Sequence, residues 1–240
     1  MADAALQLFA VHGVGEVRPG DELVDLLVEA LGAPGGPGLD DGDVLVVTSK
    51  VVSKAEGRLV PVDDQDAAAK VALVEREAVR VLRRRGDLRV TETAHGFVCA
   101  NAGIDLSNVE AGTAVLLPVD PDRSARRLRA DLRRRLDVVV GVVVSDTFGR
   151  AWRRGVTDVA IGCAGIAGIV DLRGTPDAMG RLLEATELCV VDELASAADL
   201  VMGKASGIPA VVVRGVPASW LGEGSIGDEV VRPYDEDLFR

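Results

Sequence analysis

Two apolar segments rich in β-branched residues, Val44–Thr48 and Val138–Val144, limit the folds open to this sequence. Segments of this length and composition are typical of buried strands. Val138–Val144 and a later segment, Ala210–Val213, lack the polar alternation of a half-exposed strand, so both are predicted to be central strands with two covered faces. Predicted helices lie between the strands. The sequence therefore predicts an α+β fold, with a mixed sheet and flanking helices.

The remaining elements are predicted from periodicity and turn signals. Further strands are expected at Leu6–Val11, Leu88–Val90, Gly96–Ala100, Ala114–Leu117 and Thr157–Ile161. Helices are expected at Asp21–Leu31, Ala67–Arg85, Ser124–Leu136 and Asp192–Met202. With 240 residues, 48% of them hydrophobic, the chain can bury a large core, as one domain or as two closely joined lobes.

Polar residues follow the first apolar strand directly. Ser49, Lys50, Ser53 and Lys54 come immediately after Val44–Thr48. Hydroxyl and ammonium groups both donate hydrogen bonds, and the lysines add charge, so this strand end suits an anion such as phosphate. The alternative is a solvated turn in which Ser49 caps a helix.

The second apolar strand also runs into polar residues. Asp146 and Thr147 offer hard oxygen ligands for Mg²⁺ or Mn²⁺, and Arg150, Arg153 and Arg154 could hold phosphate or carboxylate groups. The alternative is an aspartate in a turn beside a solvated arginine cluster. The repetition of a strand followed by charged residues favours a site for a metal and a phosphate.

A loop-forming segment, Asn101–Asn108, adds three polar side chains. Asp105 could supply a second metal carboxylate, and Asn108 an amide contact to a nucleotide. Turns that Asp and Asn form with their own backbone explain the same residues without a ligand.

Charge and composition exclude some classes of protein. The sequence has 27 basic and 38 acidic residues and a net charge of −11, so a nucleic acid is not an expected partner. Cys99, Cys163 and Cys189 lack CxxC spacing and lie in apolar surroundings, which predicts reduced thiols and a cytoplasmic protein. No signal peptide is recognisable, and no apolar run reaches the roughly 18 residues of a membrane helix. The known phosphate-loop pattern G-x-x-x-x-G-K-[ST] is also missing.

Five segments together resemble one enzyme family closely. They are His12–Asp21, Asp41–Arg58 with its TSKVVSK string, Ala102–Asn108, Ser145–Arg153 with the string SDTFGRAWR, and the closing residues from Arg232–Pro233 to Asp237–Phe239. In this order they resemble the GTP-dependent coenzyme F420-0:L-glutamate ligases, which add glutamate to a deazaflavin coenzyme. The resemblance covers nearly the whole chain and implies the fold specific to that family.

The resemblance also implies roles for particular residues. It assigns GTP contacts to Val14, Gly15, Glu16, Val17, Ser49, Lys54 and Asn108. It assigns Asp105 and Asp146 to a divalent metal and Thr147 to a second ion, and it makes Asp146 and Lys54 catalytic. Two Mg²⁺ or Mn²⁺ ions, K⁺ and a homodimer are implied as well, with GTP, F420-0 and L-glutamate as substrates.

One position departs from the family pattern. Archaeal members tend to have a glutamine in a late glycine-rich loop, on the second metal, whereas this sequence has Lys204. A protonated lysine cannot ligate a cation, so the second metal site is expected to be missing or completed by water. Lys204 would then contact phosphate, or act as a fixed cation that lessens the need for a second ion. The actinobacterial type, which the chain resembles more, usually continues into a flavin-binding nitroreductase-like domain. We expect residues 1–240 to form a single ligase catalytic domain without that second domain.

The expected reaction activates a carboxylate for attack by an amine. The γ-phosphoryl group of GTP would pass to the coenzyme's lactyl carboxylate, giving an acyl phosphate that the α-amino group of glutamate attacks. Glu16 and Glu56 are both candidates for the base, and further γ-linked glutamates could follow. Two alternatives remain: another metal- and nucleotide-dependent phosphoryl-transfer enzyme or ligase acting on a different acid, and a nucleotide-binding protein without catalysis.

Overall fold

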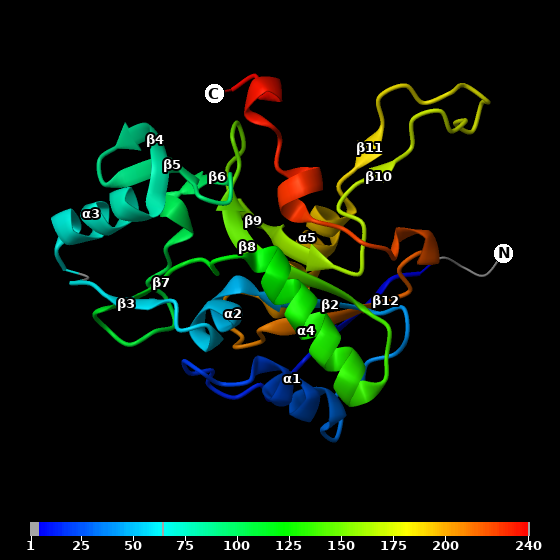
Figure 1. The fold of residues 1–240 in the computed structure, drawn as a ribbon, viewed down its shortest axis with the longest axis horizontal. Coiled ribbons are helices and arrows are strands. Elements are labelled where there is room, and N and C mark those ends of the chain that lie inside the picture. The colour runs from blue at the N-terminus through cyan, green and yellow to red at the C-terminus, as the bar shows by residue number, and fades with distance from the viewer. Residues whose placement is uncertain (1–4, 64, 240) are drawn as a thin grey trace.

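A five-stranded mixed sheet forms the centre of the protein in the computed structural model, which describes residues 5–63 and 65–239 (Figure 1). Across the sheet the order is β1-β12-β2-β8-β9. The strands are β1 (Gln7–Ala10), β2 (Val44–Thr48), β8 (Gly141–Gly149), β9 (Val156–Ala164) and β12 (Ala210–Arg214). Strands β2 and β8 pair in parallel, and the other pairs in this sheet are antiparallel. The α+β class predicted from the sequence is confirmed.

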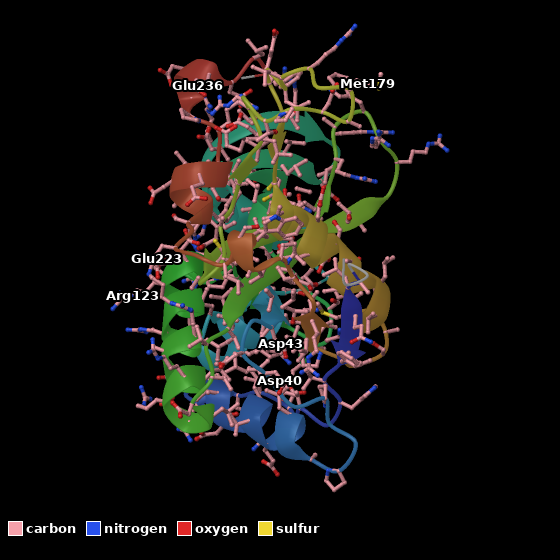
Figure 2. All side chains as sticks on the ribbon, turned by 90° about the vertical axis from the view of Figure 1, so that its right-hand side faces the viewer. Asp40, Asp43, Arg123, Met179, Glu223 and Glu236 are labelled. Atoms are coloured by element: carbon pink, nitrogen blue, oxygen red, sulfur yellow. The ribbon has the colours of Figure 1, made fainter. Side chains whose placement is uncertain are left out.

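Helices cover both faces of this sheet. Helix α4 (Pro121–Leu136) packs on β8 and β9 and also against α1 (Leu23–Gly32). Helix α5 (Val190–Met202) contacts β9, β12 and β1 from the opposite side, as Figure 2 shows in side view. The three central strands, β12, β2 and β8, are therefore covered on both faces, as their continuous apolar sequences predict.

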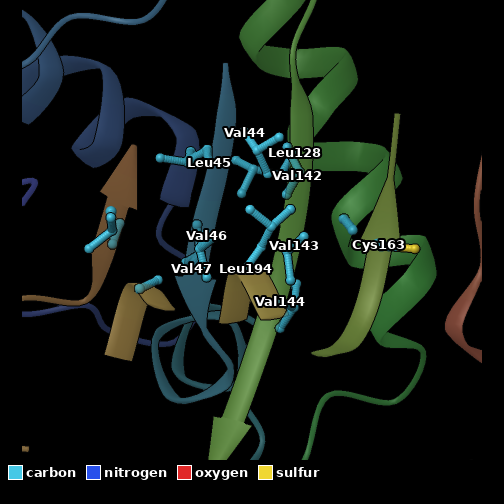
Figure 3. Close-up of a cluster of buried hydrophobic side chains, with 14 of the residues drawn as sticks. Val44, Leu45, Val46, Val47, Leu128, Val142, Val143, Val144, Cys163 and Leu194 are labelled. Carbon is cyan, nitrogen blue, oxygen red and sulfur yellow. The ribbon is translucent and has the colours of Figure 1, made fainter. Parts of the chain in front are cut away.

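The main core lies between these layers. Figure 3 shows the valines of β2 and β8 packed together with Leu128 of α4 and Leu194 of α5. Val44–Val47 and Val142–Val144 are completely shielded from solvent. Burying one such side chain contributes about 1.5–3 kcal/mol to the stability of the fold. These two strands therefore hold the residues near their ends in fixed positions.

A smaller unit lies beside one end of the sheet. It consists of α3 (Ala67–Glu77), the antiparallel pair β3 (Leu59–Pro61) and β7 (Thr113–Val115), and the sheet β4 (Ala78–Arg85), β5 (Leu88–Thr93) and β6 (Val98–Ala100). Leu73, Ala114 and Leu116 form its separate hydrophobic cluster. The hairpin expected from Leu88–Val90 and Gly96–Ala100 is present as β5 and β6. The existence of two distinct lobes stays a prediction.

The helix predicted for Ala67–Arg85 is wrong in its second half. Asp66 caps α3 by accepting a hydrogen bond from the Ala68 backbone, but the helix ends at Glu77 and the chain continues as β4. Arg80 forms a cross-strand ion pair with Glu92, and Gly86 makes the turn to β5 in a left-handed conformation. The arginines of the Arg83–Arg85 run therefore belong to a hairpin and not to a helix C-terminus.

The second apolar strand also differs from its prediction. Strand β8 begins at Gly141, three residues later than expected, and continues to Gly149. Asp146 and Thr147 therefore lie within the strand, where β9 holds them in register, and not in a loop after it.

The remaining elements are short. They are α2 (Ser49–Ala55), β10 (Val170–Asp171), β11 (Glu187–Leu188), the 3₁₀ turns Asn101–Gly103, Ala218–Trp220 and Tyr234–Glu236, and a π-helical turn at Ile226–Val230. Residues 172–186 connect β10 and β11 as a projecting arm, with Met179 at one end of the molecule (Figure 2). All three cysteines are free. None of the described helices is long and apolar enough to cross a membrane.

Candidate functional site

The carboxyl end of β2 and residues 145–147 within β8 border a cavity of about 730 Å³. Thr48 lies opposite Ser145 in the parallel pair, and beyond this point β2 gives way to α2 while β8 continues. The cavity is completed by residues of the 14–17 segment, the 100–108 segment, β9, and the end of α5 with the loop after it. A concave site lined by convergent polar groups is the usual form of a ligand pocket.

Every residue to which the family resemblance assigned a GTP, metal or catalytic role lines this one cavity. They are Val14, Gly15, Glu16, Val17, Ser49, Lys54, Asp105, Asn108, Asp146 and Thr147, and Lys50, Ser107 and Lys204 line it too. Arg150, Arg153 and Arg154 are different, because they are exposed on the turn between β8 and β9 and are not among the lining residues described. The fold thus gathers segments that are far apart in the sequence, but it leaves the predicted arginine cluster outside.

Asp146 is the central carboxylate of the cavity. Its Oδ1 accepts a 2.8 Å hydrogen bond from the Ser49 hydroxyl. Burial raises the pKa of Asp146 to about 7, the hydrogen bonds from Ser49 and the Thr147 backbone oppose this, and the nearby Asp158 and Asp105 raise it further. A carboxylate in such surroundings is stabilised by a cation, and none of the described lysines or arginines contacts it.

Two lysines of α2 are paired with carboxylates of the cavity. Lys54, largely buried, contacts Glu16 at 2.6 Å. Lys50 contacts Asp105 at 2.7 Å and the Ser107 hydroxyl at 2.8 Å. Burial alone would raise the pKa of Asp105, but the hydrogen bonds from Lys50 and Ser107 outweigh it and lower the pKa. These lysines are positioned side by side on one helix and face the cavity.

Lys204 is the third lysine of the cavity, and it contacts two further carboxylates. Its ammonium group lies 2.6 Å from Asp199, 2.7 Å from Asp158 and 2.7 Å from the Thr147 hydroxyl. Burial lowers the pKa of Lys204, but the hydrogen bonds that it donates to its two carboxylate partners prevail and raise the pKa above its ordinary value. Lys204 therefore stays charged at neutral pH.

The two carboxylates that hold Lys204 were missed from the sequence. Asp158, almost completely buried on β9, also accepts hydrogen bonds from Ser145 and Thr147, its neighbours on β8. The available signal was a charged residue at an inward position of a predicted strand, where an unpaired carboxylate would be costly. Asp199 lies on α5, where it looks like an ordinary helix-surface residue.

The Asn101–Asn108 segment forms the part of the cavity wall that Lys50 of α2 contacts. Asn101, Ala102 and Gly103 adopt left-handed conformations in succession, with φ of 51°, 55° and 68°. The buried Thr91 hydroxyl accepts a hydrogen bond from the Ala102 backbone and so supports this strained turn. Asp105 also makes a local turn by accepting from the Ser107 backbone, so it has both the turn role and a place in the cavity.

Ser49 and Glu56 are both engaged by other side chains. The Ser49 side chain makes no capping bond to α2, because its hydroxyl points to Asp146. Glu56, one candidate base, accepts a hydrogen bond from Ser124 and is not among the cavity residues described, whereas Glu16 is. Within the described part of the chain, no three His, Cys, Asp or Glu side chains are close enough to hold a metal by themselves.

The matching family and the similar known proteins are all described as F420 ligases. The sequence matches the family described as F420-0:Gamma-glutamyl ligase over residues 13–215, a range that includes the whole cavity lining. It is 42% identical to the coenzyme F420:L-glutamate ligase of Methanothermobacter thermautotrophicus, covering 98% of this chain and 99% of the relative. It is 39% identical to the protein of the same name from Archaeoglobus fulgidus, covering 98% of this chain and 96% of that protein.

Proposed function

Because this chain belongs to the F420-0:Gamma-glutamyl ligase family, we propose that it joins L-glutamate to coenzyme F420-0 at the expense of GTP. The observation that carries this proposal is the single cavity in which three lysines, several carboxylates and the family's signature segments meet. Phosphoryl transfer needs positioning and charge neutralisation more than a protein nucleophile, and the cavity offers both.

The lysines of α2 are the proposed phosphate contacts. Glu16 and Asp105 hold Lys54 and Lys50 in the nucleotide-free protein, and phosphate oxygens would take over these ammonium groups. The backbone of Val14–Val17, the Ser49 hydroxyl and Asn108 line the space beside them and would complete the GTP site.

A divalent metal fits the residues that are present. Asp146 is a partly buried carboxylate without a cationic partner among the described residues, and Asp105 raises its pKa through nearby charge. Oxygen ligands of this kind suit Mg²⁺ or Mn²⁺, with phosphate oxygens and water at the other positions. We propose Asp146 and Asp105 as ligands of one such ion; Thr147, which the resemblance assigns to a second ion, has the Lys204 ammonium at its hydroxyl. A bound ion would supply charge neutralisation for the transferring phosphoryl group.

The proposed reaction has two chemical stages. The coenzyme's lactyl carboxylate attacks the γ-phosphorus of GTP, which releases GDP and forms an acyl phosphate. The α-amino group of glutamate then attacks the acyl carbon, and inorganic phosphate leaves. Glu16 is the candidate base for the amine, because it lines the cavity and is released when a phosphate replaces it on Lys54. Further γ-linked glutamates would be added by the same two stages.

The remaining family properties are proposed on resemblance. We propose a cytoplasmic homodimer that also uses K⁺. Among the described residues, large exposed apolar side chains at Val79, Trp152, Met179, Leu182 and Leu200 offer surface for an interface.

Product mass tests the proposal directly. The protein is incubated with F420-0, glutamate, GTP and Mn²⁺, and mass spectrometry should find the coenzyme enlarged by one or more glutamyl residues together with GDP. Omission of GTP should abolish both products. GDP without glutamylated coenzyme would indicate a different acceptor acid, and nucleotide binding without GDP formation would contradict the proposed catalysis.

A further inference from the structure

Lysine is used selectively in this chain. The sequence has four lysines, Lys50, Lys54, Lys70 and Lys204, and all its other basic side chains apart from two histidines are arginines. All but Lys70 line the cavity. A lysine ammonium is a compact point charge with three donors, so it can occupy a place that a small cation would otherwise fill, which a planar guanidinium cannot do.

Each lysine of the cavity is paired with its own carboxylate or, for Lys204, with two carboxylates. The carboxylates that line the cavity are Glu16, Asp105, Asp146, Asp158 and Asp199. Glu16 contacts Lys54, Asp105 contacts Lys50, and Asp158 and Asp199 share Lys204. Asp146 is the one left without a cation among the described residues, and its side chain accepts a hydrogen bond from the Ser49 hydroxyl. In the nucleotide-free cavity, Asp146 is therefore the carboxylate that an external cation would neutralise.

All three N–H donors of the Lys204 ammonium group are in use. An ammonium group has three N–H bonds, and its oxygen contacts at 2.6–2.7 Å are with three different side chains, Thr147, Asp158 and Asp199. Asp199 lies on the last turns of α5 and Lys204 in the loop that follows, so helix and loop fix the pair locally. A phosphate could bind Lys204 only by displacing one of these partners.

We infer that the Lys204 ammonium takes the place of a second divalent ion beside Thr147, so that the protein itself binds one such ion, at Asp146. This inference rests on the proposed function for the identity of the remaining ion. It replaces the expectation that Lys204 contacts phosphate, because the three oxygens around its nitrogen form a filled cation site.

Mn²⁺ binding without nucleotide tests the inference. The free Mn²⁺ signal in electron paramagnetic resonance gives the number of tightly bound ions per chain. We expect one for the wild-type protein and two for Lys204→Gln, because that change frees Asp158 and Asp199 from the ammonium. Lys204→Met provides a second uncharged variant of similar length and should also gain one ion. Lys70→Gln removes the lysine outside the cavity and should bind as the wild type does.

The outcomes separate the inference from the proposed function. A gain of one ion in the folded Lys204 variants, checked by thermal melting, supports the replacement of a metal by Lys204. An unchanged count in both variants, or two ions in the wild type, would overturn it. The product-mass assay tests the proposed function separately, because the difference in ion count between variant and wild type does not depend on ligase activity.

Discussion

The Ser49 hydroxyl and the Asp146 carboxylate are joined by a 2.8 Å hydrogen bond although 97 positions separate them in the sequence. Ser49 is the first residue of α2, and Asp146 lies on β8 just past the point where β2 ends. The parallel pairing of β2 and β8 produces this contact, because it places Thr48, the last residue of β2, opposite Ser145, the neighbour of Asp146. The proposed phosphate and metal groups therefore share one rigid support.

Asp146→Asn should lower the rate of glutamate ligation by at least about a hundredfold, since a group that stabilises charge at a phosphoryl site is lost. Asparagine keeps the side-chain shape and can still accept from Ser49. Asp87→Asn, at an exposed position in the β4–β5 turn, is the control and should retain wild-type turnover. A folded Asp146→Asn protein with activity within a fewfold of wild type would remove Asp146 from the metal site.

Lys54→Ala should weaken GTP binding by about tenfold or more, the cost of losing a charged hydrogen bond. Binding of the deazaflavin substrate should change less, because the proposed partner of Lys54 is phosphate. Calorimetry with each ligand gives both affinities, and Lys70→Ala serves as the control. Equal GTP affinity in the wild type and in Lys54→Ala would leave Lys54 as a structural partner of Glu16 alone.

The raised pKa of Asp146 makes the stability of the metal-free protein depend on pH. The folded protein keeps a proton up to pH of about 7 that the unfolded chain releases at about pH 4. Between these values the folded state binds more protons, so the free energy of unfolding falls as pH rises, by at most about 1.4 kcal/mol per pH unit from this group.

Asp146→Asn removes that contribution. The variant should gain stability relative to the wild type as pH rises from about 5 to about 7, and the difference should then level off. Urea unfolding of both metal-free proteins across this range gives the two stability curves. Parallel curves would show that Asp146 titrates near its ordinary pKa.

GTP and divalent metal should bind cooperatively. Without metal, the carboxylates of the cavity repel a triphosphate, whereas a bound ion reverses the local charge and offers coordination positions to phosphate oxygens. GTP affinity should rise with Mn²⁺, and Mn²⁺ affinity should rise by the same factor with GTP. Titrations in both orders measure the two factors. Unchanged GTP affinity in excess chelator would mean that the lysines alone hold the nucleotide.

The homodimer should appear as twice the 25.1 kDa chain mass in light scattering at micromolar concentration. The chain has only two Trp and one Tyr, so the interface would depend mainly on aliphatic side chains such as Leu182 and Leu200. Leu182→Asp, on the projecting arm, and Leu200→Asp, on α5, place a charge at two separate exposed positions. A monomer mass for the wild-type protein would contradict the proposal.

The central sheet could be predicted because its strands are long, apolar and covered on both faces. The helix-to-strand change at Ala78 could not, because Val79 and Val81 fit a strand while the preceding residues fit a helix, and the pairing with β5 decides between them. The deciding contacts run across the turn at Gly86, as between Ala78 and Thr93, and the periodicity within Ala67–Arg85 does not report them.

The candidate site was predictable where polar residues follow apolar strands. Asp158 and Asp199 were not recognised, because each lies inside a regular element and acts through Lys204, which is distant in sequence from Asp158. The arginines after β8 were misassigned for the opposite reason. They follow the strand in sequence, but β8 continues beyond the cavity and carries them to an exposed turn.

The pairing of the cavity lysines has a consequence for chemical selectivity. An acyl phosphate reacts with any amine that has a free lone pair, and the cavity proposed to hold it contains amines of the protein itself. Lys50, Lys54 and Lys204 are each bound to a carboxylate, and for Lys204 the raised pKa keeps the nitrogen protonated. An ammonium ion cannot attack a carbonyl carbon. The carboxylate partners of Lys204, and the phosphate oxygens proposed to replace Glu16 and Asp105 on Lys54 and Lys50, would thus protect the enzyme from acylating itself and leave the activated coenzyme to the amine of glutamate.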